Sequence, residues 1–331
     1  PTPDNMVRAF APGKCILFGE HAVVYGHPAV AVAIDAGVEV RLEESERWIL
    51  DGMNFEPSRH PHIKHILTNV FEYDGPPLKM DIDSTLFPAA GLGSSAALSN
   101  AMGAALQELI EPSGTVDSIK IAKISHSAEA IAQEGRASPT DTATSALGGS
   151  VVVSGERLRG INHRFDAGLI TPEGERNWSI HSAELHPNLA EAWLVLGFTG
   201  QGSPTGKMVA GVADLLEREP NRNDDMLAIA NITNAGLAAL AAGNLPAVGM
   251  AMDACHKRLQ NIQVSSPALD LLVKSARPHS FGAKLTGAGG GGCMVALTDN
   301  PKRVAEAIEI AGGKPLISRF GAEGVRLIKK S

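Results

Sequence analysis

Residues 88–98 have the sequence PAAGLGSSAAL and give the clearest structural signal in the chain. An apolar segment ends there in a glycine loop, and the loop runs directly into a helix. Gly91 and Gly93 allow the backbone to approach another group closely, and Ser94 and Ser95 are expected to cap the helix. Free N–H groups at the start of a helix bind anions. The stretch is therefore either an anion-binding loop or an ordinary strand-to-helix turn with a serine cap.

Length and charge limit the kind of protein that carries this loop. The chain has 331 residues, more than the roughly 250–300 that one hydrophobic core usually supports, so we expect two domains. The net charge of −7 is not gathered in a tail, which argues against nucleic acid as a partner. An anionic substrate would need a local cluster of backbone amides, a metal ion and lysine.

Cysteines and apolar runs bear on the setting of the protein. Cys15, Cys255 and Cys293 are far apart and odd in number, so they indicate neither a disulfide framework nor a zinc site. Residues 1–10 lack the apolar core of a signal peptide. No stretch approaches the roughly 20 uninterrupted apolar residues of a membrane span. We expect a cytoplasmic protein with no membrane partner.

A second motif lies near the start of the chain, in APGKCILFGEHAVVYG, residues 11–26. A turn precedes Lys14, and Gly19 precedes the ionisable pair Glu20 and His21, between apolar segments that are typical of strands. Polar groups at a break between strands are often functional. Considered alone, Lys14 would be an ordinary solvated lysine.

A carboxylate follows the next long helical pattern. Residues 115–134 predict a helix with Thr115 as its cap and Glu129 near its end. The turn-rich segment GRASPTD then brings Asp141 to the start of another apolar stretch. An Asp in this setting is either a functional carboxylate or a helix cap.

Two further patterns are weaker indications of a functional site. His60, His62 and His65 do not share one helical face, so we interpret them as a solvated helix start and not as a metal site. Residues 199–207, TGQGSPTGK, form a loop of small residues before a helix. Its GxxxGK pattern is too short for a Walker A motif and lacks the hydroxyl, so we interpret the likeness as coincidence.

The third motif is KLTGAGGGGCMV, residues 284–295. A glycine run interrupted only by Ala288 has a large cost in backbone entropy, so it is not expected to be filler inside a folded domain. The alternative is a flexible linker, but strand-like residues flank the run on both sides. We expect this backbone to pack against another chain segment or a phosphate.

Together, the three motifs resemble those of the GHMP kinase superfamily of galactokinases, homoserine kinases, mevalonate kinases and phosphomevalonate kinases. They occur in the family's order from residue 11 to residue 292, and the first motif is most similar to that of mevalonate kinases. The resemblance implies an α+β fold of two domains with the active site in the cleft between them. Residues 1–190 would form a ribosomal protein S5 domain 2-like domain, and residues 191–331 a ferredoxin-like α/β domain. Family members often form homodimers, although nothing in this sequence identifies an interface.

The resemblance also implies roles for individual residues around ATP, Mg²⁺ and mevalonate. The catalytic residues would be Asp141 and Lys14, and the Mg²⁺ ligands would be Ser95 and Glu129. The loop around the ATP phosphates would consist of Pro88, Ala89, Ala90, Gly91, Leu92, Gly93, Ser94, Ser95 and Ala96. The residues near mevalonate would be Lys14, Glu20, His21, Asp141, Gly287 and Ala288.

One position departs from the pattern of mevalonate kinases. They usually carry a helical glutamate that binds Mg²⁺ eleven residues before the catalytic aspartate, and that position here is Ala130 (141 − 130 = 11). Glu129 is its neighbour, and one position on a helix turns a side chain by about 100°. Either the turn before Asp141 absorbs one extra residue, or the metal is held differently, or Glu129 is an ordinary exposed helix residue.

The implied reaction is in-line transfer of the γ-phosphoryl group of ATP to the 5-hydroxyl of mevalonate, a step of isoprenoid biosynthesis. A carboxylate that accepts the hydroxyl proton lowers the barrier, as does a lysine that stabilises the alkoxide, and the sequence does not decide between Asp141 and Lys14 for this task. The alternatives are another GHMP kinase, such as a phosphomevalonate or homoserine kinase, and a non-catalytic sensor of the same fold. The Glu20–His21 pair argues against a homoserine kinase, and the presence of Lys14 and Asp141 argues against a sensor.

Overall fold

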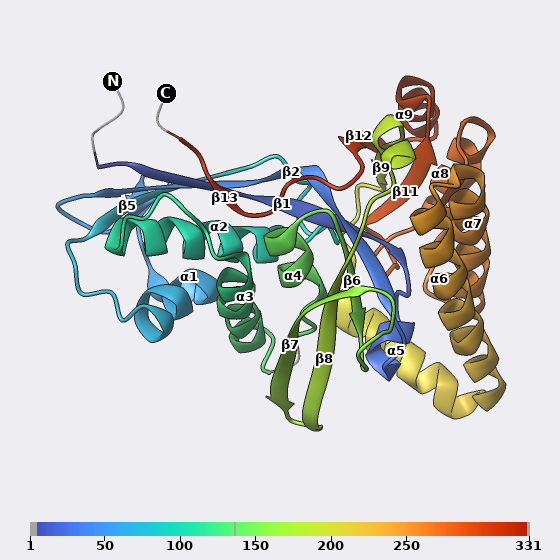
Figure 1. Cartoon of the computed structure of the whole chain (residues 1–331), viewed down its shortest axis with the longest axis horizontal. Helices are drawn as coiled ribbons and strands as arrows, with labels where there is room; N and C mark the ends of the chain where they lie inside the picture. Colours follow the sequence, from blue (N-terminus) through green and yellow to red (C-terminus); the bar gives the residue numbers. More distant parts are fainter. Residues whose placement is uncertain (1–4, 136, 330–331) are drawn as a thin grey trace.

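The structure is a computed structural model that describes residues 5–135 and 137–329. Two sheets with covering helices form its framework (Figure 1). The strands are β1 (Val7–Phe18), β2 (Ala29–Glu44), β3 (Ile49–Leu50), β4 (Met53–Asn54), β5 (Leu78–Ser84), β6 (Ser150–Ser154), β7 (Asn162–Thr171), β8 (Gly174–Ala183), β9 (Trp193–Phe198), β10 (Gly282–Leu285), β11 (Cys293–Thr298), β12 (Lys314–Arg319) and β13 (Arg326–Leu327). The α-helices are α1 (Pro61–His65), α2 (Ser94–Ile110), α3 (Ser118–Ala132), α4 (Thr140–Leu147), α5 (Thr205–Arg218), α6 (Asn223–Ala242), α7 (Leu245–Asn261), α8 (Pro267–Ala276) and α9 (Pro301–Ile310). The shorter helices are η1 (Ala22–Tyr25), η2 (Pro57–Arg59), the π-helix η3 (Ile66–Val70), η4 (Pro187–Glu191), η5 (Pro220–Arg222) and η6 (Arg277–His279).

The strands β1 and β2 form the centre of the larger sheet. They pair antiparallel along most of their length, and β2 also pairs with β6 near its start and with β5 near its end. The pairing of β1 with β2 shifts in register between Pro12 and Lys14. Such a bulge bends a strand locally and re-aims the next side chain. It lies directly before the lysine of the first motif.

The helices α1 to α4 lie on one face of the larger sheet (Figure 1). The helix α2 packs against β1 and β2 through small buried residues such as Ala97 and Ala101. Small side chains let the helix backbone lie close to the sheet. The glycine loop at the start of α2 is thereby held next to β1.

Two helix starts differ from the sequence prediction. Gly93, with φ 73°, is the N-cap of α2, and no side chain caps this helix. The prediction that Ser94 and Ser95 are its caps is therefore wrong, because both lie in the first turn. The helix α3 is capped by Asp117, whose carboxylate accepts a first-turn backbone N–H at 3.2 Å, and not by Thr115.

The smaller sheet has the strand order β10-β11-β9-β12, and its neighbouring strands are antiparallel. The chain passes through β9, the helices α5 to α8, β10, β11, α9 and β12. This β-α-β-β-α-β succession, in this strand order, is the ferredoxin-like arrangement. The ferredoxin-like fold predicted for the second half of the chain is confirmed.

The end of the described chain returns to the larger sheet, where β13 pairs with β1 (Figure 1). Ala9 lies opposite Leu327, and the N–H of Ile328 donates to the carbonyl of Arg8 at 2.9 Å. The sheets change between β8 and β9, close to the predicted division at residue 190. The division itself stays a prediction, and the final segment belongs to the first sheet and not to the second.

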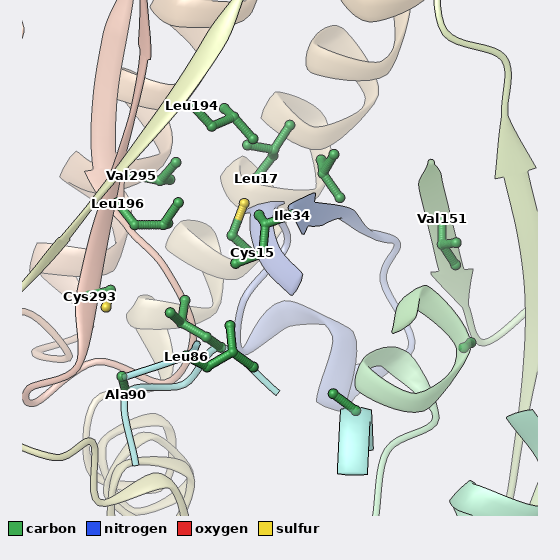
Figure 2. Close-up of a cluster of buried hydrophobic side chains, with 14 of the residues drawn as sticks. Cys15, Leu17, Ile34, Leu86, Ala90, Val151, Leu194, Leu196, Cys293 and Val295 are labelled. Carbon is green, nitrogen blue, oxygen red and sulfur yellow. The ribbon is translucent and has the colours of Figure 1, made fainter. Parts of the chain in front are cut away.

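One continuous cluster of buried apolar side chains joins the two sheets. Figure 2 shows Cys15 and Leu17 of β1 and Ile34 of β2 together with Leu194 and Leu196 of β9. Burial raises the pKa of the Cys15 thiol to about 12. The three cysteines are free and buried, in line with the absence of a disulfide pattern in the sequence.

The segment Pro220–Ala242, which contains α6, is the one helix of the described chain that is long and apolar enough to cross a membrane by length and composition. Its most apolar window has a mean hydropathy of 1.3, and 44% of that window is buried inside the structure. A Cβ at Gly236 would lie 2.5 Å from the ring of Phe18, and α6 also packs along α7. These are the contacts of a core helix in a folded domain.

Candidate active site

Lys14 connects the first motif to the glycine loop and to α4. Its side chain is only 4% exposed, and its Nζ donates to the carbonyl of Gly91 at 2.9 Å. The same Nζ lies 3.1 Å from Oδ1 of Asp141, which stands in the first turn of α4 and is 43% exposed. The two residues predicted to be catalytic therefore lie together. Lys14 is buried, and the reading of it as an ordinary solvated lysine is excluded.

Two glycines let the loop lie directly on Lys14. The backbone N–H of Lys14 donates to the carbonyl of Leu92 at 2.9 Å, and a Cβ at Gly13 would lie 2.8 Å from that carbonyl. Gly93 has φ 73°, and a Cβ there would lie 3.2 Å from Cγ of Lys14. The first N–H groups of α2, which lack helical acceptors, thus begin beside a buried cation. This arrangement favours a bound phosphate.

The two predicted Mg²⁺ ligands also lie together. The Ser95 side chain is near enough to Glu129 to lower the pKa of its carboxyl, and Nε2 of Gln133 donates to Oε2 of Glu129 at 2.8 Å. Nε2 of His62 lies 3.4 Å from Oε1 of Glu129, whose side chain is 7% exposed. Burial raises the pKa of Glu129, but the contacts with His62 and Ser95 outweigh it and hold that pKa below its ordinary value. The carboxylate is therefore ionised at neutral pH.

The turn after α3 contains two residues with positive φ. Glu134 and Gly135 have φ of 54° and 85°, and the N–H of Gly135 donates to the carbonyl of Ala130 at 2.6 Å. Glu129 and Ala130 are both buried, and Glu129 lies near Ser95. Of the three readings left open by the sequence, this geometry excludes an exposed Glu129.

The oxygen atoms of Ser95 and Glu129 suit Mg²⁺, which prefers oxygen ligands and usually completes its shell with water and substrate phosphate. Oε1 of Glu129 is buried without a hydrogen-bond partner, so one carboxylate oxygen is left to a ligand. Among the described residues, no group of three or more His, Cys, Asp or Glu could hold a metal ion. A Mg²⁺ ion bound here would therefore depend on the ATP phosphates for further ligands.

At the other end of the site, the first motif contacts the third. Lys284 forms an ion pair with Glu20, and both side chains are buried. Nε2 of His21 lies 2.8 Å from the carbonyl of Ala288. Burial lowers the pKa of His21, so the ring is neutral and Nε2 donates to this carbonyl. Glu20 thus faces the interior and Lys284, and His21 is held against the glycine run.

The third motif packs on the glycine loop through Gly287 and Gly292. A Cβ at Gly292 would lie 2.9 Å from the carbonyl of Ala90, and one at Gly287 would lie 3.7 Å from the carbonyl of Gly91. The prediction that this glycine run packs against another chain segment is confirmed. Its lack of side chains allows two loops to share one narrow space.

The loop between β9 and α5 also belongs to the site, which sequence reasoning missed. The N–H of Ser203 donates to the carbonyl of Ala89 at 3.1 Å, and its hydroxyl donates to the carbonyl of Gly289 at 2.8 Å. The N–H of Gly292 donates to the carbonyl of Gln201 at 2.8 Å. This loop therefore joins the glycine loop to the third motif. Its run of small residues, TGQGSPTGK, is the signal in the sequence that indicates a close approach of backbones.

His62 is a second residue whose place the sequence did not reveal. Its side chain is only 18% exposed and contacts Glu129, so the interpretation as a solvated helix start is wrong for this histidine. His65 contacts the hydroxyl of Ser127 instead, at 3.0 Å between Nε2 and Oγ. The spacing of the three histidines in the sequence shows only whether they share one face of a helix. It does not show which other helix packs against them.

Family models match both halves of the chain: GHMP kinases N terminal domain at residues 61–149, and GHMP kinases C terminal at residues 237–314. A mevalonate kinase of Pyrococcus abyssi is 32% identical over 98% of this chain and 98% of its own length. The chain belongs to the GHMP kinase superfamily. A mevalonate kinase of Methanothermobacter thermautotrophicus is 33% identical to this GHMP kinase over 87% of it and 89% of the relative.

Solved structures of GHMP kinases share the fold. The crystal structure of L. major mevalonate kinase in complex with R-mevalonate gives a TM-score of 0.76 at 23% identity and covers 95% of each chain. The Methanococcus jannaschii mevalonate kinase gives a TM-score of 0.75 at 24% identity, over 97% of this chain and 99% of the other. The two-domain GHMP kinase fold predicted from the motifs is confirmed.

Proposed function

We propose that this GHMP kinase transfers the γ-phosphoryl group of ATP to the 5-hydroxyl of mevalonate. Relatives that match it over nearly its whole length are named mevalonate kinases, and one solved neighbour holds R-mevalonate. The single observation that carries the chemistry is the buried Lys14, which pairs with Asp141 beside the first N–H groups of α2. This constellation brings a proton acceptor and a cation to the end of a phosphate-binding loop.

In this mechanism the substrate hydroxyl loses a proton while its oxygen forms a bond to the γ-phosphorus. Asp141 accepts that proton, because it is the exposed member of the pair, and a general base contributes about 10²–10⁴-fold. The buried Nζ of Lys14 stabilises the negative charge that develops on the attacking oxygen. The bond from the γ-phosphorus to the bridging oxygen breaks, and ADP leaves.

The glycine loop and α2 bind the phosphates through backbone N–H groups, whose partial positive charge the helix dipole increases. Ser95 and Glu129 would hold Mg²⁺, which when bound neutralises phosphate charge during the transfer. Leu92 and Gly91, through their carbonyls, fix the backbone and the Nζ of Lys14 relative to this loop. Most of the rate enhancement would come from this positioning and from charge neutralisation.

Phosphorus NMR of the product tests the proposal directly. The purified protein is incubated with ATP, Mg²⁺ and mevalonate. A phosphate on the 5-oxygen couples to the neighbouring CH₂ protons and gives a split signal, which supports the proposal. An unsplit signal would indicate the tertiary 3-hydroxyl, and no product at all would also contradict it. Homoserine, galactose and phosphomevalonate then test for a sibling kinase, and ligand binding without turnover would indicate a sensor.

A further inference from the structure

Lys284 and Glu20 form an ion pair that is shielded from solvent, with side chains 0% and 1% exposed. Nζ of Lys284 also donates to the carbonyls of Leu285 at 2.6 Å and Ile16 at 3.5 Å. A buried charge is costly unless it is paired and hydrogen-bonded. The lysine of the third motif is therefore committed to these partners and is not free to contact a phosphate.

This pair joins the two sheets, because one partner follows β1 and the other lies in β10. Beside it, the N–H of Ile16 donates to Oγ1 of Thr286 at 2.8 Å, and that hydroxyl donates back to the carbonyl of Ile16 at 2.9 Å. Further along the same two segments, Nε2 of His21 donates to the carbonyl of Ala288 at 2.8 Å. Successive contacts thus dock residues 16–21 on residues 284–288.

The charge on Glu20 has few other neighbours to balance it. Burial raises the pKa of Glu20, and Lys284 opposes that rise more strongly than the more distant Lys14 does. The nearby thiols of Cys15 and Cys255 are neutral, because burial raises the pKa of each to about 12. Without Lys284, Glu20 would keep an uncompensated negative charge or would take up a proton and lose its fixed partner.

We propose that Lys284 is a positioning residue for the part of the site that binds mevalonate. Through Glu20 it keeps residues 16–21, with the ring of His21, docked on the third motif. It also leaves this part of the site without excess negative charge, which would repel the carboxylate of mevalonate. The ATP phosphates would bind at Lys14 and the start of α2. This inference rests on the proposed function and on the position near His21 that the family resemblance implies for mevalonate.

Steady-state kinetics of Lys284→Met tests the inference, with each substrate varied in turn. We expect the KM for mevalonate to rise at least about tenfold while the KM for ATP stays within about twofold, because truncating one partner leaves the other buried and unpaired. Glu20→Gln, which breaks the same pair from the other side, should give the same selective rise. The double variant Glu20→Gln/Lys284→Met leaves neither charge unpaired, so its KM for mevalonate should return towards that of the wild type.

Ser318→Ala is the matched control. The buried Ser318 hydroxyl of β12 accepts the N–H of Asp35 in β2 at 2.9 Å, so it also joins the two sheets, but through neither the first nor the third motif. A merely structural role for Lys284 would change both KM values together, or would give Ser318→Ala the same selective effect, and either result overturns the inference. If Lys284→Met does not fold, Glu20→Gln and the double variant carry the test.

The failure of the proposed function is recognised separately. It would appear as a wild-type chain without mevalonate-dependent turnover, before any variant is compared. A wild type that phosphorylates mevalonate, together with variants whose mevalonate KM is unchanged, would overturn only the role of Lys284.

Discussion

Lys14 and Asp141 form one ion pair whose members differ sharply in exposure. The ammonium is enclosed by β1 and the glycine loop, whereas the carboxylate reaches solvent from the first turn of α4. A buried ammonium group is held in one position by the residues around it. An exposed carboxylate can accept a proton from a hydroxyl that binds beside it. In the proposed mechanism, the pair therefore divides charge stabilisation and proton transfer between its two members.

Replacing Asp141 by asparagine tests this division. The amide still reaches Lys14 but cannot accept a proton, so kcat should fall by about 10²–10⁴-fold while ATP binding is retained. Steady-state kinetics and a binding titration with ATP measure the two quantities. Asp83→Asn, an exposed carboxylate that pairs with Arg41, is the control and should keep full activity. An unchanged kcat in Asp141→Asn would show that Asp141 is not the base.

His256 should make folding stability depend on pH. Its Nδ1 accepts the N–H of Leu285 at 3.0 Å, and its Nε2 donates to Asp270 at 2.9 Å. Burial lowers the pKa of His256 from 6.5 to about 4, although Asp270 opposes this shift. Between these values the unfolded chain binds a proton that the folded chain does not, so stability falls as the pH is lowered. The loss amounts to at most about 3 kcal/mol.

Urea unfolding at about pH 7.5 and about pH 5 measures this loss. His256→Asn keeps an acceptor for the N–H of Leu285 but cannot be protonated, so its free energy of unfolding should fall less. Other buried histidines, such as His126 and His181, contribute equally to both proteins. Equal losses in the two proteins would refute this role for His256.

The end of α7 supports the third motif. The N–H of Val264 donates to the carbonyl of Leu259 at 3.2 Å, and the N–H of Gln263 donates to that of Gln260 at 3.0 Å. These are the two bonds of a Schellman motif, which usually carries glycine at the left-handed position. Here that position is Gln263, with φ 63°. The carbonyl of Val264, fixed in this way, accepts the N–H of Gly290 at 2.8 Å.

Gln263→Gly should therefore stabilise the protein. Glycine adopts the left-handed conformation without the penalty of a Cβ, so we expect a gain of about 1 kcal/mol in the free energy of unfolding. Chemical denaturation measures the gain. Lys257→Gly, at an exposed position inside α7, is the control and should lose about 1 kcal/mol. A loss of stability in both variants would show that Gln263 makes contacts that outweigh its backbone strain.

The last described segment of the chain adds the strand β13 to the larger sheet, beside β1. The N–H of Val325 donates to the carbonyl of Ala146 at the end of α4, and the guanidinium of Arg326 lies 4.5 Å from the ring centre of Phe10. The helix that carries Asp141 is thus held at its far end by residues distant in sequence. The segment therefore stabilises the helix that carries Asp141 as well as the larger sheet.

Removal of residues 321–331 should lower the free energy of unfolding by at least about 2 kcal/mol, because it deletes β13 and exposes buried apolar surface. Thermal unfolding measures the change. Hydrogen exchange should show that protection is lost in residues 7–10 of β1 and at the end of α4. A chain that lacks only residues 330 and 331 is the control. Unchanged protection in β1 would show that β13 adds nothing to the sheet.

The sequence predicted the parts of the site that depend on local backbone chemistry. Glycines that permit a tight loop, and a lysine and a carboxylate beside turns, are visible in short stretches, and their order indicated the fold. The contacts of His62 and Ser203 were not visible, because each is made with a segment far away in the chain. The buried pair of Lys284 with Glu20 was hidden for the same reason. Both residues stood inside recognised motifs, but motifs do not state which residue faces which.

The strand β1 also has a consequence for the geometry of the site. It runs from Lys14, beside the glycine loop, to Phe18, shortly before His21, and its pairing with β2 shifts once more between Ile16 and Phe18. Four residues of strand (18 − 14) span about 13 Å, so backbone pairing sets the separation between Lys14 and the turn at Glu20 and His21. A slip of β1 by one residue against β2 would turn its side chains to the other face of the sheet and would move Lys14 away from Asp141.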